Sequence, residues 1–192
     1  PLEDRRVTIP RASGRVTFPC SFMLVGAMNP CRCGYFGHPT HPCTCTPQDV
    51  KRYISRISGP LLDRIDIEVE LPSISYDELA ATGATGETSD TIRARVVRAR
   101  KFAAARMSGE PGIFCNAQLD AAGIRKYCIA DDAAGAMLRA AYDRMGLSAR
   151  GYDRIMRVAR TIADLSGKRL LDEDSLLEAL QYRAQEKVEL TF

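Results

Sequence analysis

Two close pairs of cysteines are the residues of this sequence best suited to hold a metal ion. The pairs are Cys31 with Cys33 and Cys43 with Cys45. Four thiolates surround a tetrahedral zinc ion and leave it no open position, so the pattern predicts a structural rather than a catalytic zinc site. The two cysteines of a zinc-binding pair are usually separated by two or more residues. Here a single residue separates them, so the match to a zinc site is imperfect.

The loop between the pairs contains two alternative ligands, His38 and His41. Free thiols or a stress-induced disulfide are the alternatives to zinc. The chain has seven cysteines, an odd number, and no signal-peptide pattern, whereas a secreted scaffold normally pairs all its cysteines. We therefore expect a reducing, cytoplasmic location. Cys20, Cys115 and Cys128 stand alone and are interpreted as small core hydrophobes.

Asn29 follows the most apolar run of the chain. A continuous apolar run predicts a strand buried on both faces, as in a parallel α/β sheet, and we place it at residues 22–29. Pro30 ends this strand. Because α/β proteins bind ligands at the carboxyl ends of such strands, Asn29 is a candidate ligand-contacting residue.

Arg11 and Arg15 lie near the tip of a hairpin that the alternating β-prone residues 6–18 predict around a short glycine-containing turn. Pro10 removes a hydrogen-bond donor, so we expect an edge or free-standing hairpin. The two arginines form either a solvated surface or a basic finger directed at phosphates. Charge alone favours the solvated surface.

Arg64 and Arg150 are further candidates for contacting an anion. Arg64 lies between a short turn and a predicted strand at residues 65–71, where it either reaches outward or pairs with a neighbouring aspartate. Arg150 lies in the first turn of a helix that Ser148 caps. A cation there opposes the helix dipole, which argues for a nearby anion, although a plain surface arginine fits the sequence equally well.

The elements that must position these residues form an α/β half followed by an all-α half. A helix begins at Thr46-Pro47, and the small, glycine-rich residues 81–89 predict a linker. Residues 90–192 show helical patterns throughout. The net charge of +3 does not establish a nucleic-acid partner. No apolar run approaches the ~20 residues of a membrane span, so we expect no membrane partner.

Several segments together resemble one family, the magnesium-chelatase-like AAA+ ATPases, and within it most closely the branch of bacterial competence proteins. The matching segments are residues 6–19, 22–31, 58–66 and 148–165. They span nearly the whole chain in the expected order, and the cysteine loop distinguishes this branch from true magnesium chelatase subunits. The resemblance implies that residues 1–80 are the distal part of the AAA+ α/β domain and that residues 90–192 are its helical lid.

The resemblance also implies roles for the candidate residues. Asn29 would be sensor 1, which positions the attacking water against the γ-phosphate, and Arg150 would be sensor 2 on the lid. Arg64 would be the arginine finger, offered to the nucleotide of a neighbouring subunit. The hairpin carrying Arg11 and Arg15 would be the pre-sensor-1 hairpin, which projects toward DNA in the pore of a hexamer.

The parts that bind the triphosphate are missing from these 192 residues. The sequence contains no Gly-x-x-x-x-Gly-Lys-Ser/Thr phosphate loop and no apolar strand ending in Asp-Glu. ATP and Mg²⁺ would therefore bind only in a longer parent protein, and we expect the fragment alone to be inactive.

Taken together, the sequence predicts part of a hexameric ATPase that drives DNA translocation or branch migration in natural transformation. One alternative is the ATPase subunit of a motor that inserts a metal into a porphyrin. The other is a non-enzymatic zinc module that binds nucleic acid passively. The presence or absence of a phosphate loop before Pro1 would separate the last reading from the first two.

Overall fold

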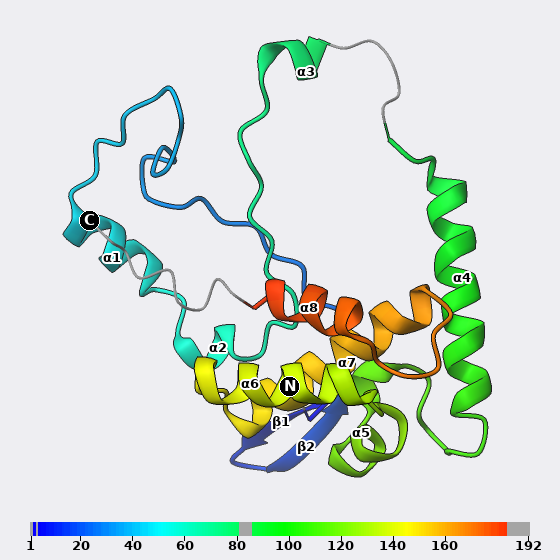
Figure 1. The fold of residues 1–192 in the computed structure, drawn as a ribbon. Helices are drawn as coiled ribbons and strands as arrows, with labels where there is room; N and C mark the ends of the chain where they lie inside the picture. The colour runs from blue at the N-terminus through cyan, green and yellow to red at the C-terminus, as the bar shows by residue number, and fades with distance from the viewer. Residues whose placement is uncertain (1, 3, 81–85, 184–192) are drawn as a thin grey trace. The chain divides into compact units, whose positions relative to one another are not determined.

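The computed structural model describes residues 2, 4–80 and 86–183, which form two compact units divided after Ile65 (Figure 1). The first unit holds the hairpin, the cysteine loop and two short helices. The second unit is helical.

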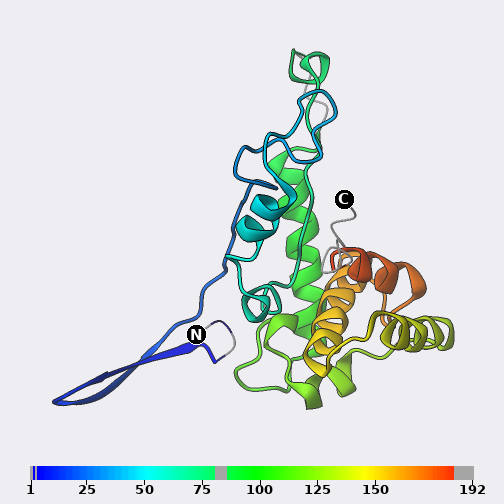
Figure 2. The same ribbon diagram turned by 90° about the vertical axis from the view of Figure 1, so that its left-hand side faces the viewer.

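The predicted hairpin is confirmed. Strand β1 (Arg6–Arg11) pairs antiparallel with β2 (Gly14–Pro19), with Arg6 opposite Pro19 and Arg11 opposite Gly14. A two-residue turn joins the strands, and Gly14 has φ 145°, a conformation that a residue with a Cβ rarely adopts. Figure 2 shows the hairpin as a two-stranded ribbon joined to the rest of its unit by an extended segment.

The prediction of a buried strand at residues 22–29 is wrong for the described structure. This segment has no regular secondary structure, and its apolar side chains are exposed, Met23 by 87% and Val25 by 80%. The predicted strand at residues 65–71 is likewise absent. A buried strand needs neighbouring strands on both sides. Among the described residues the hairpin is the one sheet, so neither segment finds a partner.

Helix α1 (Pro47–Ile54) begins where the sequence predicts. The side chain of Thr46 accepts a hydrogen bond from the Asp49 amide, and Pro47 occupies the first helical position. The helix buries Val50, which is 1% exposed. It ends at Ile54, and Gly59–Leu62 then forms the single turn α2.

The second unit is helical over its described residues, as predicted for residues 90–183, and residues 184–192 of the predicted helical half lie outside the described residues. Its elements are α3 (Tyr76–Ala80), α4 (Ser89–Arg106), the 3₁₀ turn η1 (Asn116–Gln118), α5 (Ala121–Tyr127), α6 (Asp132–Met145), α7 (Ala149–Leu165) and α8 (Glu173–Gln181). Ser148 caps the N-terminus of α7 as expected. Gly146 caps the C-terminus of α6 in the left-handed conformation. Residues 81–85 of the predicted linker lie outside the described residues.

Helix α7 is the centre of this unit and packs against α4, α5 and α8. Its apolar face, which includes Ile155, Ala159 and Ala163, is fully buried in one core with Leu171 and Leu176. Ala159 and Ala163 are small and let neighbouring helices approach closely. No described helix is long and apolar enough to cross a membrane.

A buried polar network joins α4, η1 and α7. The carboxylate of Asp164 is 2% exposed and accepts hydrogen bonds from Arg106 at 2.5 and 2.7 Å, from Asn116 at 2.8 Å and from Arg160 at 3.1 Å. Arg160 also donates to the carbonyls of Lys168 and Arg169, after the end of α7. The network therefore connects helices that are far apart in the sequence.

Candidate functional site

The four cysteines of the loop converge, as their spacing predicts. All four sulfur atoms lie within 4.8 Å of one another, and none of the cysteines forms a disulfide. The Sγ atom of Cys31 lies 3.3 Å from that of Cys33 and 3.7 Å from that of Cys43, and the Sγ atoms of Cys33 and Cys43 are 3.5 Å apart. Cys31 is fully buried.

These distances fit a tetrahedral metal ion. Four sulfur atoms at a zinc–sulfur distance of about 2.3 Å stand about 3.8 Å from one another. The sulfurs of Cys31, Cys33 and Cys43 therefore need only small shifts to receive an ion, and that of Cys45 lies within 4.8 Å of all three. The tip of the loop is held by turns at Gly34 and Gly37, both at positive φ, so the chain can reverse between the two cysteine pairs.

The backbone around the thiols favours an anionic ligand set. The amides of Tyr35 and Thr44 donate to the Cys33 thiol and lower its pKa to about 5. At Cys43 the amide of Cys45 lowers the pKa, but burial and the thiols of Cys33 and Cys31 outweigh it and raise that pKa to about 12. Since thiols that crowd one another cannot all lose their protons without a cation, a metal ion is the group that resolves this repulsion.

The alternative histidine ligands lie outside the thiol cluster. The Nδ1 atom of His38 accepts from the backbone amides of Thr40 and His41 at 3.2 and 3.1 Å. The rings of Tyr35, His38 and His41 gather instead, with centroids 4.9–5.7 Å apart. The group that could hold a metal consists of the four cysteines.

Asn29 is exposed and lies at the entrance to the cysteine loop. A Cβ placed on Gly34 would be 3.9 Å from the Asn29 side-chain nitrogen, so the asparagine side chain turns back over the loop. Its predicted position at the end of a buried strand is not observed, because residues 22–29 form no strand.

Arg64 follows the turn α2 and is half-buried. Its guanidinium donates to the carbonyl of Pro60 at 2.7 Å. Asp66, one of the aspartates next to it in sequence, pairs instead with Arg154 of α7 at 3.3 Å. Arg64 thus belongs to the first unit, beside a helical turn, as its sequence position indicates.

Arg11, Arg15 and Arg150 are all exposed. Arg11 and Arg15 flank the turn of the hairpin, where Arg11 is opposite Gly14 and Arg15 is opposite Pro10. Arg150 lies in the first turn of α7, two residues after the Ser148 cap, and belongs to the second unit. The bounds of α7 therefore place the Arg150 side chain at the N-terminus of the helix, where the sequence predicted it.

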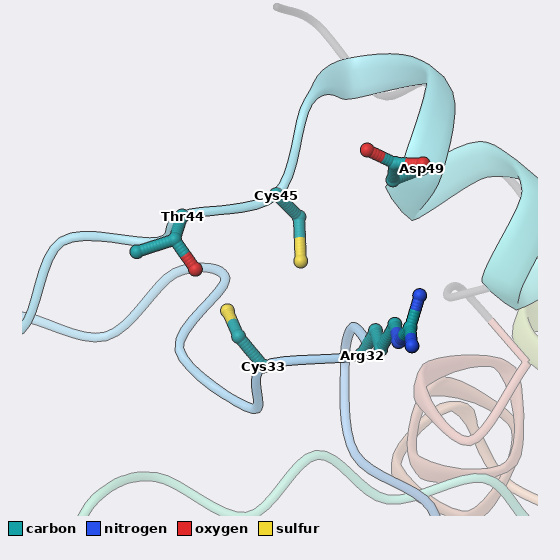
Figure 3. Close-up of a pocket in the computed structure, with 5 residues that line it drawn as sticks. All are labelled: Arg32, Cys33, Thr44, Cys45 and Asp49. Carbon is teal, nitrogen blue, oxygen red and sulfur yellow. The ribbon is translucent and has the colours of Figure 1, made fainter.

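One group of residues is close in space but was not foreseen as a site. A cleft between the cysteine loop and α1 is lined by Arg32, Asp49, Arg52, Tyr53 and Arg56. Figure 3 shows the thiols of Cys33 and Cys45 facing a common space while the Arg32 side chain extends away from them toward Asp49. The nearby arginines at positions 52 and 56 were the available signal, although Arg56 lies in the turn after α1 and not on the helix.

Comparison with known proteins identifies relatives over nearly the whole chain. The family described as "Magnesium chelatase, subunit ChlI" matches residues 1–79, and the family "Magnesium chelatase, subunit ChlI C-terminal" matches residues 86–183. The competence protein ComM of Haemophilus influenzae is 41% identical over 96% of this chain, which corresponds to 35% of ComM. The uncharacterized protein YifB of Escherichia coli is 35% identical over 98% of this chain and 36% of its own length.

An uncharacterized protein of Mycobacterium tuberculosis is 38% identical over 95% of this chain, again corresponding to 35% of the relative. The chain thus spans about a third of the length of the curated relatives that it matches.

Proposed function

We infer the function of this chain from its family, because it belongs to the family of the magnesium chelatase subunit ChlI, together with the competence protein ComM. We propose that it is the distal part of an AAA+ ATPase motor that moves DNA. The observation that carries this proposal is the 41% identity to a protein named for competence, over 96% of the chain. Competence is the uptake of DNA, so a motor of this kind would act on DNA strands, by translocation or branch migration.

Three residues would respond to ATP in this motor. Asn29 would orient the attacking water, Arg64 would reach the nucleotide of a neighbouring subunit, and Arg150 would contact the nucleotide from the lid. The proposal is supported by the chemistry of each position: a guanidinium that stabilises charge developing on a transferred phosphoryl group accelerates the reaction strongly. The phosphate loop and the magnesium ligands would come from a longer parent protein, assembled as a hexamer.

The hairpin would contact DNA in the same assembly. Its two strands are almost wholly exposed, and Arg11 and Arg15 stand on either side of the turn. A free-standing ribbon with cations at its tip suits contact with phosphates, which fixes position without reading sequence.

The ion in the cysteine cluster would be zinc. Thiolate ligands in a tetrahedral arrangement favour zinc over the hard cations magnesium and calcium, which prefer oxygen. With four cysteine ligands the ion has no open position, so it would stabilise the loop and take no part in the chemistry.

The name of the family favours a second function. A motor that drives metal insertion into a porphyrin would share the same ATP-responding residues. It would act on a large protein partner instead of DNA, so DNA would not stimulate its ATPase activity. A passive zinc module that binds nucleic acid is the third reading, and it would bind DNA without hydrolysing ATP.

The experiment uses the protein expressed from its complete gene, with and without single-stranded DNA. We expect DNA-stimulated ATP hydrolysis in the wild type. The Arg64→Ala variant should retain binding of a fluorescent ATP analogue but lose about a thousandfold or more of its hydrolysis rate, as arginine fingers do. Lys51→Ala, an exposed cation on α1, is the control and should hydrolyse ATP like the wild type. ATP hydrolysis that DNA leaves unchanged would favour the porphyrin motor.

A further inference from the structure

The cleft between the cysteine loop and α1 carries an excess of positive charge. Arg32, Arg52 and Arg56 line it, and Asp49 is the one carboxylate among the lining residues. Hydrogen bonds from the Thr46 hydroxyl and amide hold the pKa of Asp49 below its usual range. The charges of Arg52 and Arg32 lower this pKa further. These two cations therefore lie close to the same carboxylate, and the cleft retains positive charge after Asp49 is counted.

Such a cluster is electrostatically unfavourable in the absence of an anion. Arg52 lies in α1 and Arg56 lies in the turn that follows it, and like charges held in one cleft repel each other. Arg32 adds a third positive charge from the loop. The guanidinium fork binds phosphate oxygens through two parallel hydrogen bonds, so a phosphate group is the anion that this cleft fits.

The loop that supplies Arg32 also presents a cluster of rings. The Tyr35 ring lies 5.7 Å from that of His38 and 5.3 Å from that of His41, and the two imidazoles are 4.9 Å apart. Tyr35 is 44% exposed despite these contacts. Its own amide donates to the Cys33 thiol, so the ring cluster is fixed to the cysteine centre two residues away.

We propose that the cysteine loop and α1 together form a binding surface for single-stranded DNA, with phosphates in the arginine cleft and a base stacked on the Tyr35 ring cluster. The cleft is lined by residues other than the hairpin arginines and other than the three residues proposed to respond to ATP. The inference rests on the proposed function, because it assumes that the protein acts on DNA. It assigns the cysteine centre a second task, which is to hold Arg32 and Tyr35 in place on the same short loop.

The combination of groups points to a single strand. Proteins that bind single strands without reading sequence join a positively charged groove to aromatic rings on which bases stack. The bases of a duplex are already stacked on one another, so a duplex would use the arginines but not the rings. An acidic peptide would likewise leave the rings without a partner.

The arginine cleft is tested by the salt dependence of binding to a fluorescent dT oligonucleotide. The protein is expressed from its complete gene. Each phosphate contact contributes about 0.7 to the slope of log affinity against log salt for a single strand. Arg52→Ala and Arg56→Ala should therefore each lower the slope by about 0.7. Lys51→Ala removes the same charge from the same helix but lies outside the cleft, so its slope should equal that of the wild type.

The ring cluster is tested with a second oligonucleotide of the same length that carries no bases. Tyr35→Ala should weaken binding to dT about tenfold, within the range measured for one stacked base, and leave binding to the abasic strand unchanged. Tyr142→Ala is the matched control, because Tyr142 is a tyrosine of similar exposure, 41%, in the helical unit. Metal content should equal that of the wild type in every variant.

Each outcome decides the proposal. If the wild type binds no DNA, the proposed function and this surface both fail. If it binds DNA and the arginine and Tyr35 variants bind like the wild type, this surface alone fails. Equal losses of Tyr35→Ala on the dT and abasic strands would overturn base stacking. Loss of subunit assembly in the arginine variants, seen by gel filtration, would place these arginines at a protein interface and also overturn the proposal.

Discussion

Each thiol of the cysteine cluster has a different local environment. Cys33 receives two backbone amides, which lower its pKa to about 5, whereas crowding and burial raise the pKa of Cys43 to about 12. The Cys43 thiol is therefore one that a bound cation would help to deprotonate near neutral pH. This makes Cys43 the informative residue to replace.

We predict that Cys43→Ser loses the bound zinc. The purified wild type should contain about one zinc ion per chain, since four thiolates complete a tetrahedral site. A serine hydroxyl is a poor zinc ligand, so the variant should contain little zinc. Elemental analysis measures both. The control is Cys115→Ser, because Cys115 lies outside the cluster and is exposed, not buried in a core as the sequence predicted. Equal zinc content in Cys43→Ser and the wild type would contradict the four-cysteine site.

At the scale of single residues, the sequence predicted which residues form the cysteine cluster better than it predicted the contacts that residues make. The four cysteines could be grouped because a short loop brings its two ends together whatever its exact path. The Asp66–Arg154 pair could not be predicted, because it joins residues far apart in the sequence. Nor could the ring contacts of Tyr35, His38 and His41, which depend on how the loop turns at its glycines.

At the scale of elements, helix ends were predictable and strand partners were not. Capping is local, so Thr46 and Ser148 marked the beginnings of two helices correctly. A strand depends on neighbours that its own residues do not specify. Residues 22–28 are apolar enough for a buried strand, yet they are exposed among the described residues.

The buried network of α7 gives a prediction for the stability of the helical unit. Asp164→Asn would remove the negative charge that faces Arg106 and Arg160, of which Arg160 is fully buried. Leaving a buried charge without its partner typically costs about 3–5 kcal/mol. We expect a loss of this size in the free energy of unfolding of the 192-residue chain, measured by urea titration of the helical circular dichroism signal.

The control for this network is Asp174→Asn, which removes the same charge from a carboxylate that is 91% exposed. Because exposed ion pairs contribute about 0–1 kcal/mol, this variant should unfold nearly like the wild type. Equal stability of the two variants would show that the network does not hold α4, η1 and α7 together.

At the scale of the whole molecule, the exposed apolar segment and the length of the relatives have one explanation. The chain spans about a third of the proteins that it matches. A sheet that covers residues 22–28 would then be completed by strands from the rest of a longer protein, and Asn29 would reach its ligand edge only there. What covers residues 22–28 was therefore the feature that the 192 residues predicted least well.

This view predicts that the 192-residue chain alone does not hydrolyse ATP. It has no phosphate loop to hold the triphosphate, and Asn29 is exposed beside an unpaired segment. We expect phosphate release from the purified chain at the rate of a buffer blank, whereas the protein expressed from its complete gene should hydrolyse ATP. An excess of the isolated chain can then be mixed into that protein. If the fragment enters the assembly, the hydrolysis rate falls, because the fragment provides no nucleotide site. If the fragment stays outside the assembly, the rate is unchanged. Hydrolysis by the isolated chain that Arg64→Ala and Arg150→Ala both abolish would contradict this prediction, because these residues would then complete a site within the 192 residues.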